Sequence, residues 1–339
     1  MKKYILLFTM FLASFFVVAQ KDSTKAKVDS IQTKIHALKT AKDSIIAADT
    51  IRYWKKGGLI GLNFSQSSFT NWAAGGENSL SVTSLVSLFA NYKKDKDSWD
   101  NTLDLAYGML QTGAAPLRKN EDKIDFSSKY GRYAFLKHWY YTALVSFKSQ
   151  FADGYNYPND SVVISHFMAP GYLLGSLGMD YKTTDNSFSL FLSPLTWKTI
   201  FVNDQKLADA GAYGVDKAEY DSVAGVYVMV KHGATITNQF GGYLKMTFKK
   251  DIFKNVNFAT KLELFSNYLK NPQNIVVNWE TLIGLKVNKF LSASISTNMI
   301  YDNDIPVPVK REINGVTVDG TGPRLQFKEV LAIGFSYKF

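Results

Sequence analysis

The 339-residue chain contains no cysteine and only eight prolines. Without cysteine it cannot form a disulfide, a thiolate nucleophile, a cysteine-ligated metal site or a cysteine-linked lipid anchor. Beyond residue 20 it also lacks any run of about 18 continuous apolar residues, which excludes a transmembrane helix. Yet 46% of the residues are hydrophobic and 14% are aromatic, which excludes a disordered chain. The apolar residues must therefore lie in interrupted segments.

The first residues have the composition of a secretory signal. Lys2 and Lys3 precede an apolar run at 4–18, and the small Ala19 stands before the expected cleavage site. A membrane anchor is the alternative, but the run is too short to span a bilayer. We expect 1–19 to be a cleaved signal peptide, whose loss lowers the net charge from +10 to +8 by removing two lysines.

Residues 20–53 are polar and rich in lysine, and they contain neither glycine nor proline. Val28, Ile31, Ile35 and Leu38 follow the three–four spacing of an amphipathic helix. Two interpretations remain open for this expected periplasmic segment. It forms either a short helix that docks in the periplasm or plugs the lumen, or a frayed tether, because a helix of this length is marginal alone.

Alternation of apolar and polar residues at period two dominates the rest of the chain, as in Trp99, Leu103 and Tyr107 against Asp100 and Thr102. Each such segment exceeds the roughly 9–11 residues that a tilted strand needs to cross a bilayer. The predicted strands lie near 57–69, 79–92, 98–111, 123–135, 139–151, 170–182, 187–201, 233–249, 255–268, 275–288, 290–301 and 325–339.

Short and long connections alternate between these segments, with long ones expected at 112–121, 152–170, 202–232 and 302–324. A soluble β-sandwich does not require this alternation, whereas an outer-membrane barrel combines short periplasmic turns with long external loops. We therefore predict an all-β fold over 54–339, a transmembrane antiparallel outer-membrane β-barrel of about twelve strands.

The last segment alternates Leu331, Phe335 and other apolar residues up to the terminal Phe339. A C-terminal strand that ends in phenylalanine resembles the signal read by outer-membrane assembly machinery, which we expect to be a partner. Glu329 falls on the lipid-facing phase of the same strand. It predicts either a β-bulge or a contact with an outer-membrane protein partner.

Mixed charges fall on the inward phase of the predicted barrel. The candidates for lining the lumen are Asp104, Lys129, Lys261, Glu263 and Glu280. Such charges can pair and close a narrow lumen, or they can line a small polar pore, because an unpaired buried charge is costly.

The segment 69–78 joins the first two strands, and Gly75 and Gly76 allow it to fold tightly over the barrel mouth. Trp72 either stacks on a sugar or a partner side chain or packs into the rim. The candidate binding residues of this loop are Asn71, Trp72, Glu77 and Asn78.

Three runs of sequence, Gln66–Asn78, Asp122–Gly131 and Ser193–Val215, resemble an uncharacterised family of Bacteroidota outer-membrane β-barrels, a domain of unknown function. The motif F-x-N-W-x-x-G-G-x-N is contained in the first run, and Trp197 stands where the third run would have glycine. The resemblance extends over nearly the whole barrel. It implies the outer membrane of a Gram-negative, Bacteroidota-like cell, but no established activity and no catalytic residue.

Enzyme and cofactor motifs are missing from the sequence. There is no G-x-S-x-G, and Asp302-Asn303-Asp304 lacks the glycine and distal glutamate of a calcium loop. We expect no catalytic residue, no metal and no cofactor. The basic balance suits anionic outer-membrane lipids and lipopolysaccharide rather than nucleic acid.

Two functions remain. The first is a structural or interaction subunit of an outer-membrane assembly. The alternative is a narrow channel for small polar solutes.

Overall fold

The computed structural model describes residues 25, 27–43, 53–68, 77–223, 225–313 and 316–339. The chain divides into two units, Met1–Tyr53 and Trp54–Phe339. In the first unit, residues 27–43 form a helix whose apolar residues, among them Ile31 and Leu38, are exposed. The expected signal peptide lies outside the described residues. Within the described ranges, no helix is long and apolar enough to cross a membrane.

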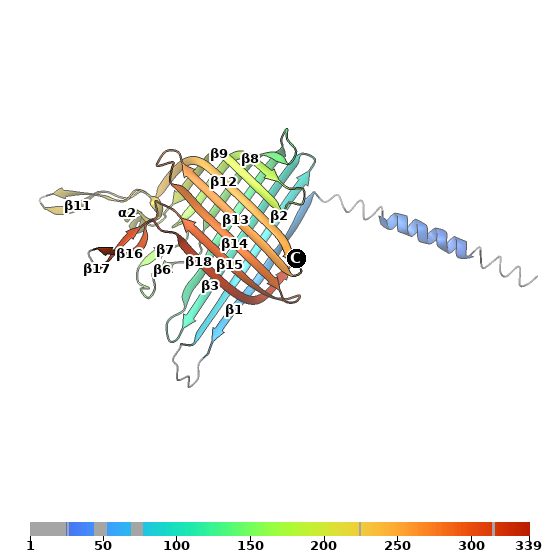
Figure 1. Cartoon of the computed structure of the whole chain (residues 1–339), viewed down its shortest axis with the longest axis horizontal. Coiled ribbons are helices and arrows are strands. Elements are labelled where there is room, and N and C mark those ends of the chain that lie inside the picture. Colours follow the sequence, from blue (N-terminus) through green and yellow to red (C-terminus); the bar gives the residue numbers. More distant parts are fainter. Residues whose placement is uncertain (1–24, 26, 44–52, 69–76, 224, 314–315) are drawn as a thin grey trace, which may run out of the picture. The chain divides into compact units, whose positions relative to one another are not determined.

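Twelve strands of the second unit form a closed antiparallel barrel, which confirms the predicted fold (Figure 1). They close in the order β1-β18-β15-β14-β13-β12-β9-β8-β5-β4-β3-β2, so each strand pairs with its neighbour along the chain. The barrel strands are β1 (Trp54–Ser67), β2 (Ser79–Lys94), β3 (Asp97–Thr112), β4 (Arg118–Tyr133), β5 (Trp139–Ser149), β8 (Gly171–Lys182), β9 (Phe188–Phe201), β12 (Ile236–Phe253), β13 (Val256–Asn267), β14 (Ile275–Lys286), β15 (Leu291–Tyr301) and β18 (Gln326–Lys338).

The connections at one end of the barrel carry structure that the alternation pattern does not predict. Three of them contain two-stranded hairpins, and one adds a short helix and a 3-10 turn. These elements are β6 (Gly154–Tyr155), β7 (Val163–Ser165), α2 (Gln205–Asp209), η1 (Ala212–Gly214), β10 (Glu219–Val223), β11 (Val226–Lys231), β16 (Val307–Ile313) and β17 (Val316–Gly322).

One sequence expectation about boundaries needs correction. The connection after β3 is short, because β4 already begins at Arg118, where it pairs with Leu110 of β3 across a local bulge. Trp197 lies within β9, inside the strand predicted at 187–201.

The outer surface of the barrel is apolar, as the hydrocarbon of a bilayer requires. Trp54, Tyr92 and Trp99 form a tilted aromatic cluster at the short-turn end, with ring centroids 5.2 and 5.7 Å apart. Aromatic residues favour this position at a membrane–water interface. Large apolar side chains on the outward phase that are exposed include Ile60, Leu62, Phe64, Leu80, Leu88, Val145, Leu173, Leu177, Leu331, Ile333 and Phe335.

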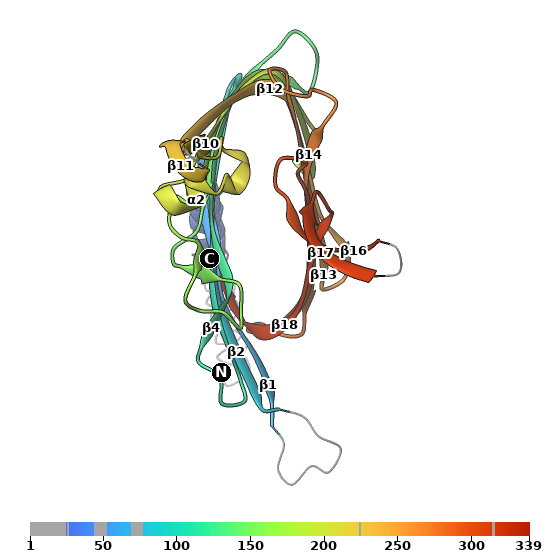
Figure 2. The same cartoon turned by 90° about the vertical axis from the view of Figure 1, so that its left-hand side faces the viewer.

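The barrel closes along a short seam between β1 and β18. Their pairing runs only from Leu59–Lys338 to Phe64–Ile333, whereas β1 pairs with β2 along its whole length. In the described part of the chain, 326–332 of β18 pair with β15 alone. The far ends of β1 and β2 project away from the wall formed by β18 (Figure 2).

Candidate functional site

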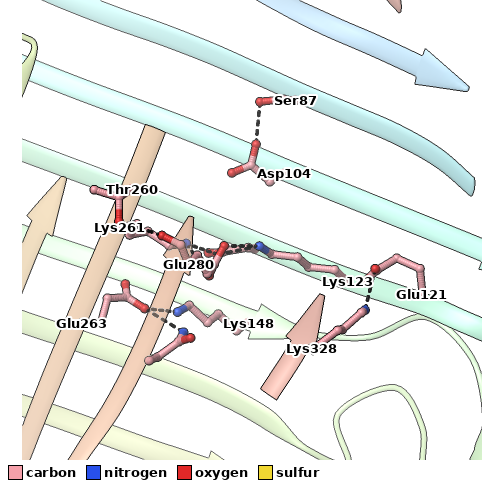
Figure 3. Close-up of polar contacts among 12 residues, drawn as sticks. Ser87, Asp104, Glu121, Lys123, Lys148, Thr260, Lys261, Glu263, Glu280 and Lys328 are labelled. Atoms are coloured by element: carbon pink, nitrogen blue, oxygen red, sulfur yellow. Dashed lines mark hydrogen bonds and ion pairs between the residues drawn. The ribbon is translucent and has the colours of Figure 1, made fainter. Parts of the chain in front are cut away.

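Ion pairs cross the lumen and join opposite walls of the barrel. β4 and β14 lie opposite each other in the strand order, on the two long sides of an oval ring (Figure 2). Even so, the ammonium of Lys123 on β4 lies 2.9 Å from a carboxylate oxygen of Glu280 on β14. Lys261 of β13 reaches both Glu280 and Asp125 of β4, each at 2.9 Å. The side chains therefore bridge the narrow dimension of the oval (Figure 3).

Glu263 of β13 is the most heavily bonded carboxylate of this group. It pairs with Lys148 of β5, accepts a hydrogen bond from the Tyr243 hydroxyl at 2.8 Å, and lies 3.7 Å from the Lys245 ammonium. Asn278 also donates to it at 3.3 Å. Only 6% of Glu263 is exposed, so its charge is compensated by these neighbours rather than by water. We call Lys123, Asp125, Lys148, Lys245, Lys261, Glu263 and Glu280 the lumen bridge.

Lys129, which the sequence grouped with these charges, lies in a different cluster. Its ammonium is 2.7 Å from Asp180 of β8 and donates to Ser189 at 2.8 Å. Lys182 joins the same cluster, at 2.6 Å from Asp100 and 3.6 Å from Asp180. These charges lie toward the short-turn end of the barrel, where they pair among themselves.

Asp104 is also separate from the lumen bridge (Figure 3). It accepts a hydrogen bond at 2.6 Å from Ser87 of the adjacent β2. Ser87 and the inward-facing Thr102 are both exposed to solvent. Of the five predicted lumen charges, the structure therefore brings together Lys261, Glu263 and Glu280, and leaves Asp104 and Lys129 apart.

Many inward side chains of the wall around Asp104 are small. Asp104 on β3 and Lys328 on β18 face the lumen, so alternation from these two residues gives the inward positions of β1, β2, β15 and β18. The small or short polar inward residues there are Gly61, Asn63, Ser81, Thr83, Ser87, Ser292, Ser294, Ser296, Asn298, Ala332, Gly334 and Ser336. The larger Leu59, Leu85, Phe89 and Val330 share the same inward phase. A further ion pair joins Lys328 of β18 to Glu121 of β4 at 2.6 Å.

A cavity of about 290 Å³ lies in the lumen on the long-loop side of the bridge. Lys148 and Glu263 of the bridge form part of its lining. Lys198 of β9 also lines it, with its ammonium 5.0 Å from the ring centroid of Phe265 and 5.5 Å from that of Tyr172. The described residues provide no ion pair to Lys198. Its ammonium lies against the two ring faces, and the carboxylates of Asp302 and Asp304 act on its charge from beyond ion-pair distance.

The connection between β9 and β12 folds against the rim. Asp204 caps α2 by accepting a hydrogen bond from the backbone N–H of Leu207 at 3.0 Å. Hydrogen bonds from Gln205, from the Gly233 backbone and from His232 hold the pKa of Asp209 below its usual range. Burial raises the pKa of Tyr213 to about 12, and its hydroxyl donates to the Ile164 carbonyl at 2.6 Å. The pairing ties 202–235 to the neighbouring loop.

The remaining candidate residues lie at the rim or outside the described part of the chain. Asn71 and Trp72 fall outside it. Glu77 and Asn78 are exposed, and the Asn78 carbonyl accepts a hydrogen bond from the Gly113 backbone at 2.7 Å. Glu329 is exposed on the outward face of β18, opposite Thr297.

Sequence reasoning missed four charges of the lumen bridge, Lys123, Asp125, Lys148 and Lys245, and missed Lys198 altogether. A signal for Lys123 and Asp125 was present, because they alternate at period two with the chosen Lys129. In the part of the chain that the structure describes, no group of histidines and acidic residues could hold a metal ion.

Comparison with known proteins gives a limited family match. Residues 64–155 match a family model described as a protein of unknown function, DUF3078. The match includes the expected runs Gln66–Asn78 and Asp122–Gly131 but ends before Ser193–Val215, so it is shorter than the predicted resemblance. No curated protein matches the chain.

Several solved structures are similar in architecture. The COG4313 outer membrane channel from Pseudomonas putida F1 is 10% identical with a TM-score of 0.37, over 85% of this chain and 98% of that one. The translocator domain of the autotransporter NalP from Neisseria meningitidis is 8% identical with a TM-score of 0.30, over 91% and 98%. Salmonella typhi OmpF in complex with daunomycin is 10% identical with a TM-score of 0.28, over 84% and 97%. None of these likenesses assigns a function to this chain.

Proposed function

We propose that the protein is an outer-membrane barrel with a narrow, water-filled passage for small polar solutes. The passage runs along the wall of β1, β2, β15 and β18, beside the lumen bridge. The observation that carries the proposal is the solvent exposure of Ser87 of β2 and of Thr102 of the adjacent β3, which both face inward. Leu85 and Phe89 flank Ser87 on the inward phase, and the small inward side chains of β15 and β18 leave room for water beside them.

The bridge and the passage have complementary roles in this proposal. The width of a barrel's lumen grows with the number of strands. Side chains nearly fill the lumen of an eight-stranded barrel, whereas a barrel of about sixteen strands encloses an aqueous channel, so twelve strands give an intermediate width. The lumen bridge closes the half between β4, β5, β13 and β14 by pairing long charged side chains. Small polar solutes would pass through the other half, where serine and glycine are frequent on the inward phase, and Asp104 supplies a negative charge there.

Single-channel recording in a planar bilayer tests the passage. Wild-type protein is expected to give small, steady openings, and Ser294→Trp is expected to lower their conductance because the indole occupies the wall of the passage. The matched control is Ser84→Trp, since Ser84 is exposed on the outward phase of β2. Asp104→Asn is expected to shift selectivity away from cations. A silent wild-type barrel, or equal effects of the two tryptophans, contradicts the passage.

A role as an interaction subunit is the second candidate, favoured by Glu329. A carboxylate exposed to hydrocarbon is unfavourable, and it lies on the stretch of β18 that the described part of β1 does not pair. Exposed Phe327 and Leu331 flank it on the same face. An outer-membrane protein with a cationic group at this depth could form an ion pair with Glu329, and one of its strands could hydrogen-bond to the edge of β18.

Purification after mild solubilisation of native membranes tests this second role. Wild-type protein is expected to retain a stoichiometric partner that Glu329→Lys loses and the control Glu219→Lys keeps, because Glu219 lies in the β10–β11 hairpin away from the seam. A barrel that purifies alone, or a partner that both variants retain, argues against the role. Lipopolysaccharide and assembly through Phe339 remain proposed contacts under either function.

A further inference from the structure

The cavity on the long-loop side of the lumen bridge has the features of a ligand site. Its volume of about 290 Å³ is close to the lower limit for pockets that hold small molecules. Most of the surface that lines it is apolar, although polar and charged residues also contribute. The aliphatic and phenyl side chains of the lining are those of Leu174, Leu264, Phe265, Val276, Ile300 and Ile305.

Lys198 is the cation of this cavity that forms no ion pair with a described residue, although Asp302 and Asp304 act on its charge from a longer distance. Lys148 is paired with Glu263, and Asp122 is paired with Lys119 at 2.8 Å and accepts the backbone N–H of Phe151. Asp302 accepts a hydrogen bond from the Asp304 backbone and makes no ion pair with a described residue. An ammonium carries three N–H donors and no acceptor, so the two ring faces beside Lys198 leave these donors unused.

We propose that the cavity binds a small carboxylate with an apolar body, with Lys198 holding the carboxylate. The apolar body would lie against Phe265, Val276 and Ile300, which line the same cavity. A carboxylate bonded to an ammonium in a site with little water gains a charge-assisted hydrogen bond, and the apolar lining adds burial. A phosphate or an inorganic anion would leave that lining unused.

This site deepens the proposed passage, because it lies in the same lumen. Binding at equilibrium does not require conduction, so the two ideas fail separately. A barrel that binds the ligand but does not conduct would remove the passage and keep the site. A barrel that conducts but binds no carboxylate would remove the site and keep the passage.

Titration calorimetry on the folded barrel in detergent, with 3-phenylpropionate as the probe, tests the site. The wild type is expected to bind this carboxylate, and Lys198→Met is expected to raise its Kd by about tenfold or more, the effect of one charged hydrogen bond. Phenethylamine, which has the same ring and the opposite charge, is expected to bind more weakly. Lys249→Met is the matched control, because Lys249 is exposed at the other end of β12.

A second variant keeps the proposal testable if Lys198→Met does not fold, as judged by heat-shifted gel mobility. Ile300→Trp fills the cavity without changing Lys198, and it is expected to abolish binding of 3-phenylpropionate. The proposal is overturned if the wild type does not bind the carboxylate, if phenethylamine binds as tightly, or if every folded variant binds like the wild type.

Discussion

Removing one charge from the centre of the lumen bridge is expected to destabilise the whole barrel. In Glu263→Gln the side chain keeps its size and can still accept from Tyr243, but Lys148 and Lys245 lose their shared carboxylate. Because Glu263 is 6% exposed, little water can replace it. Breaking a buried pair from one side costs about 3–5 kcal/mol. We expect the free energy of unfolding to fall by that amount.

The matched control is Glu121→Gln, which removes the carboxylate from the pair with Lys328. The side chains of this pair are 47% exposed at Lys328 and 25% exposed at Glu121. Water can therefore solvate the remaining ammonium, and an exposed pair contributes only about 0–1 kcal/mol. Both variants delete one negative charge from a carboxylate that faces the lumen, so they differ mainly in burial.

Urea titration of the barrel in lipid vesicles, followed by tryptophan fluorescence, measures both variants. Adding Lys148→Met to Glu263→Gln is expected to recover part of the loss, because one of the two unpaired ammonium groups is then gone. The reasoning is refuted if the two single variants differ by less than about 1 kcal/mol, since buried and exposed pairs would then be equivalent. It is also refuted if the double variant is no more stable than Glu263→Gln.

Three smaller effects are expected. Gly178→Ala should lower the free energy of unfolding by about 1–3 kcal/mol in the same titration, because a Cβ there would meet the backbone carbonyl of Leu192. The control is Gly175→Ala in the same strand, which should be neutral because its Cβ would meet nothing within 4 Å. The pKa of Asp209 is lowered by folding, so its stabilisation is present above its unfolded pKa of about 3.9 and is lost as the pH falls below that value. Hydrogen exchange should therefore show the 202–235 loop losing protection in acid, and Asp209→Asn should remove this pH dependence. Lys231→Ala should leave thermal stability unchanged, because its pair with Glu219 is 68% and 60% exposed, and a large loss would contradict this.

The sequence alone determined the strands, because alternation is a local property. Each predicted segment corresponds to one barrel strand, with boundaries that differ by a few residues, as at Arg118 of β4. None of the loop hairpins was predicted. For β6 and β7 the reason is their length, because two and three residues are too few for a period-two pattern. Alternation also put Lys261, Glu263 and Glu280 on the inward phase, although it could not say which charges they meet.

Closure of the barrel decided which charged side chains of the lumen form ion pairs with each other. Lys123 and Glu280 are 157 residues apart and come from strands on opposite walls. They meet because the ring is oval, and the ring's shape follows from the packing of all twelve strands. No local pattern contains that information, so the sequence could name Lys129 and Asp104 as lumen charges but could not show that they lie apart from the lumen bridge.

Lys198 shows a second limit of local patterns. In β9 the inward phase includes Ser193 before Pro194 and changes to Thr196 and Lys198 after it, because a bulge separates the pairs Tyr243–Ser193 and Gly241–Thr196. A continuous alternation read from Ser193 would have turned Lys198 toward lipid. The sequence determines the strands and their apolar faces, because neighbours along the chain set them. The tertiary structure decides which charges pair and where a cavity remains, because only closure and bulges bring distant strands into contact.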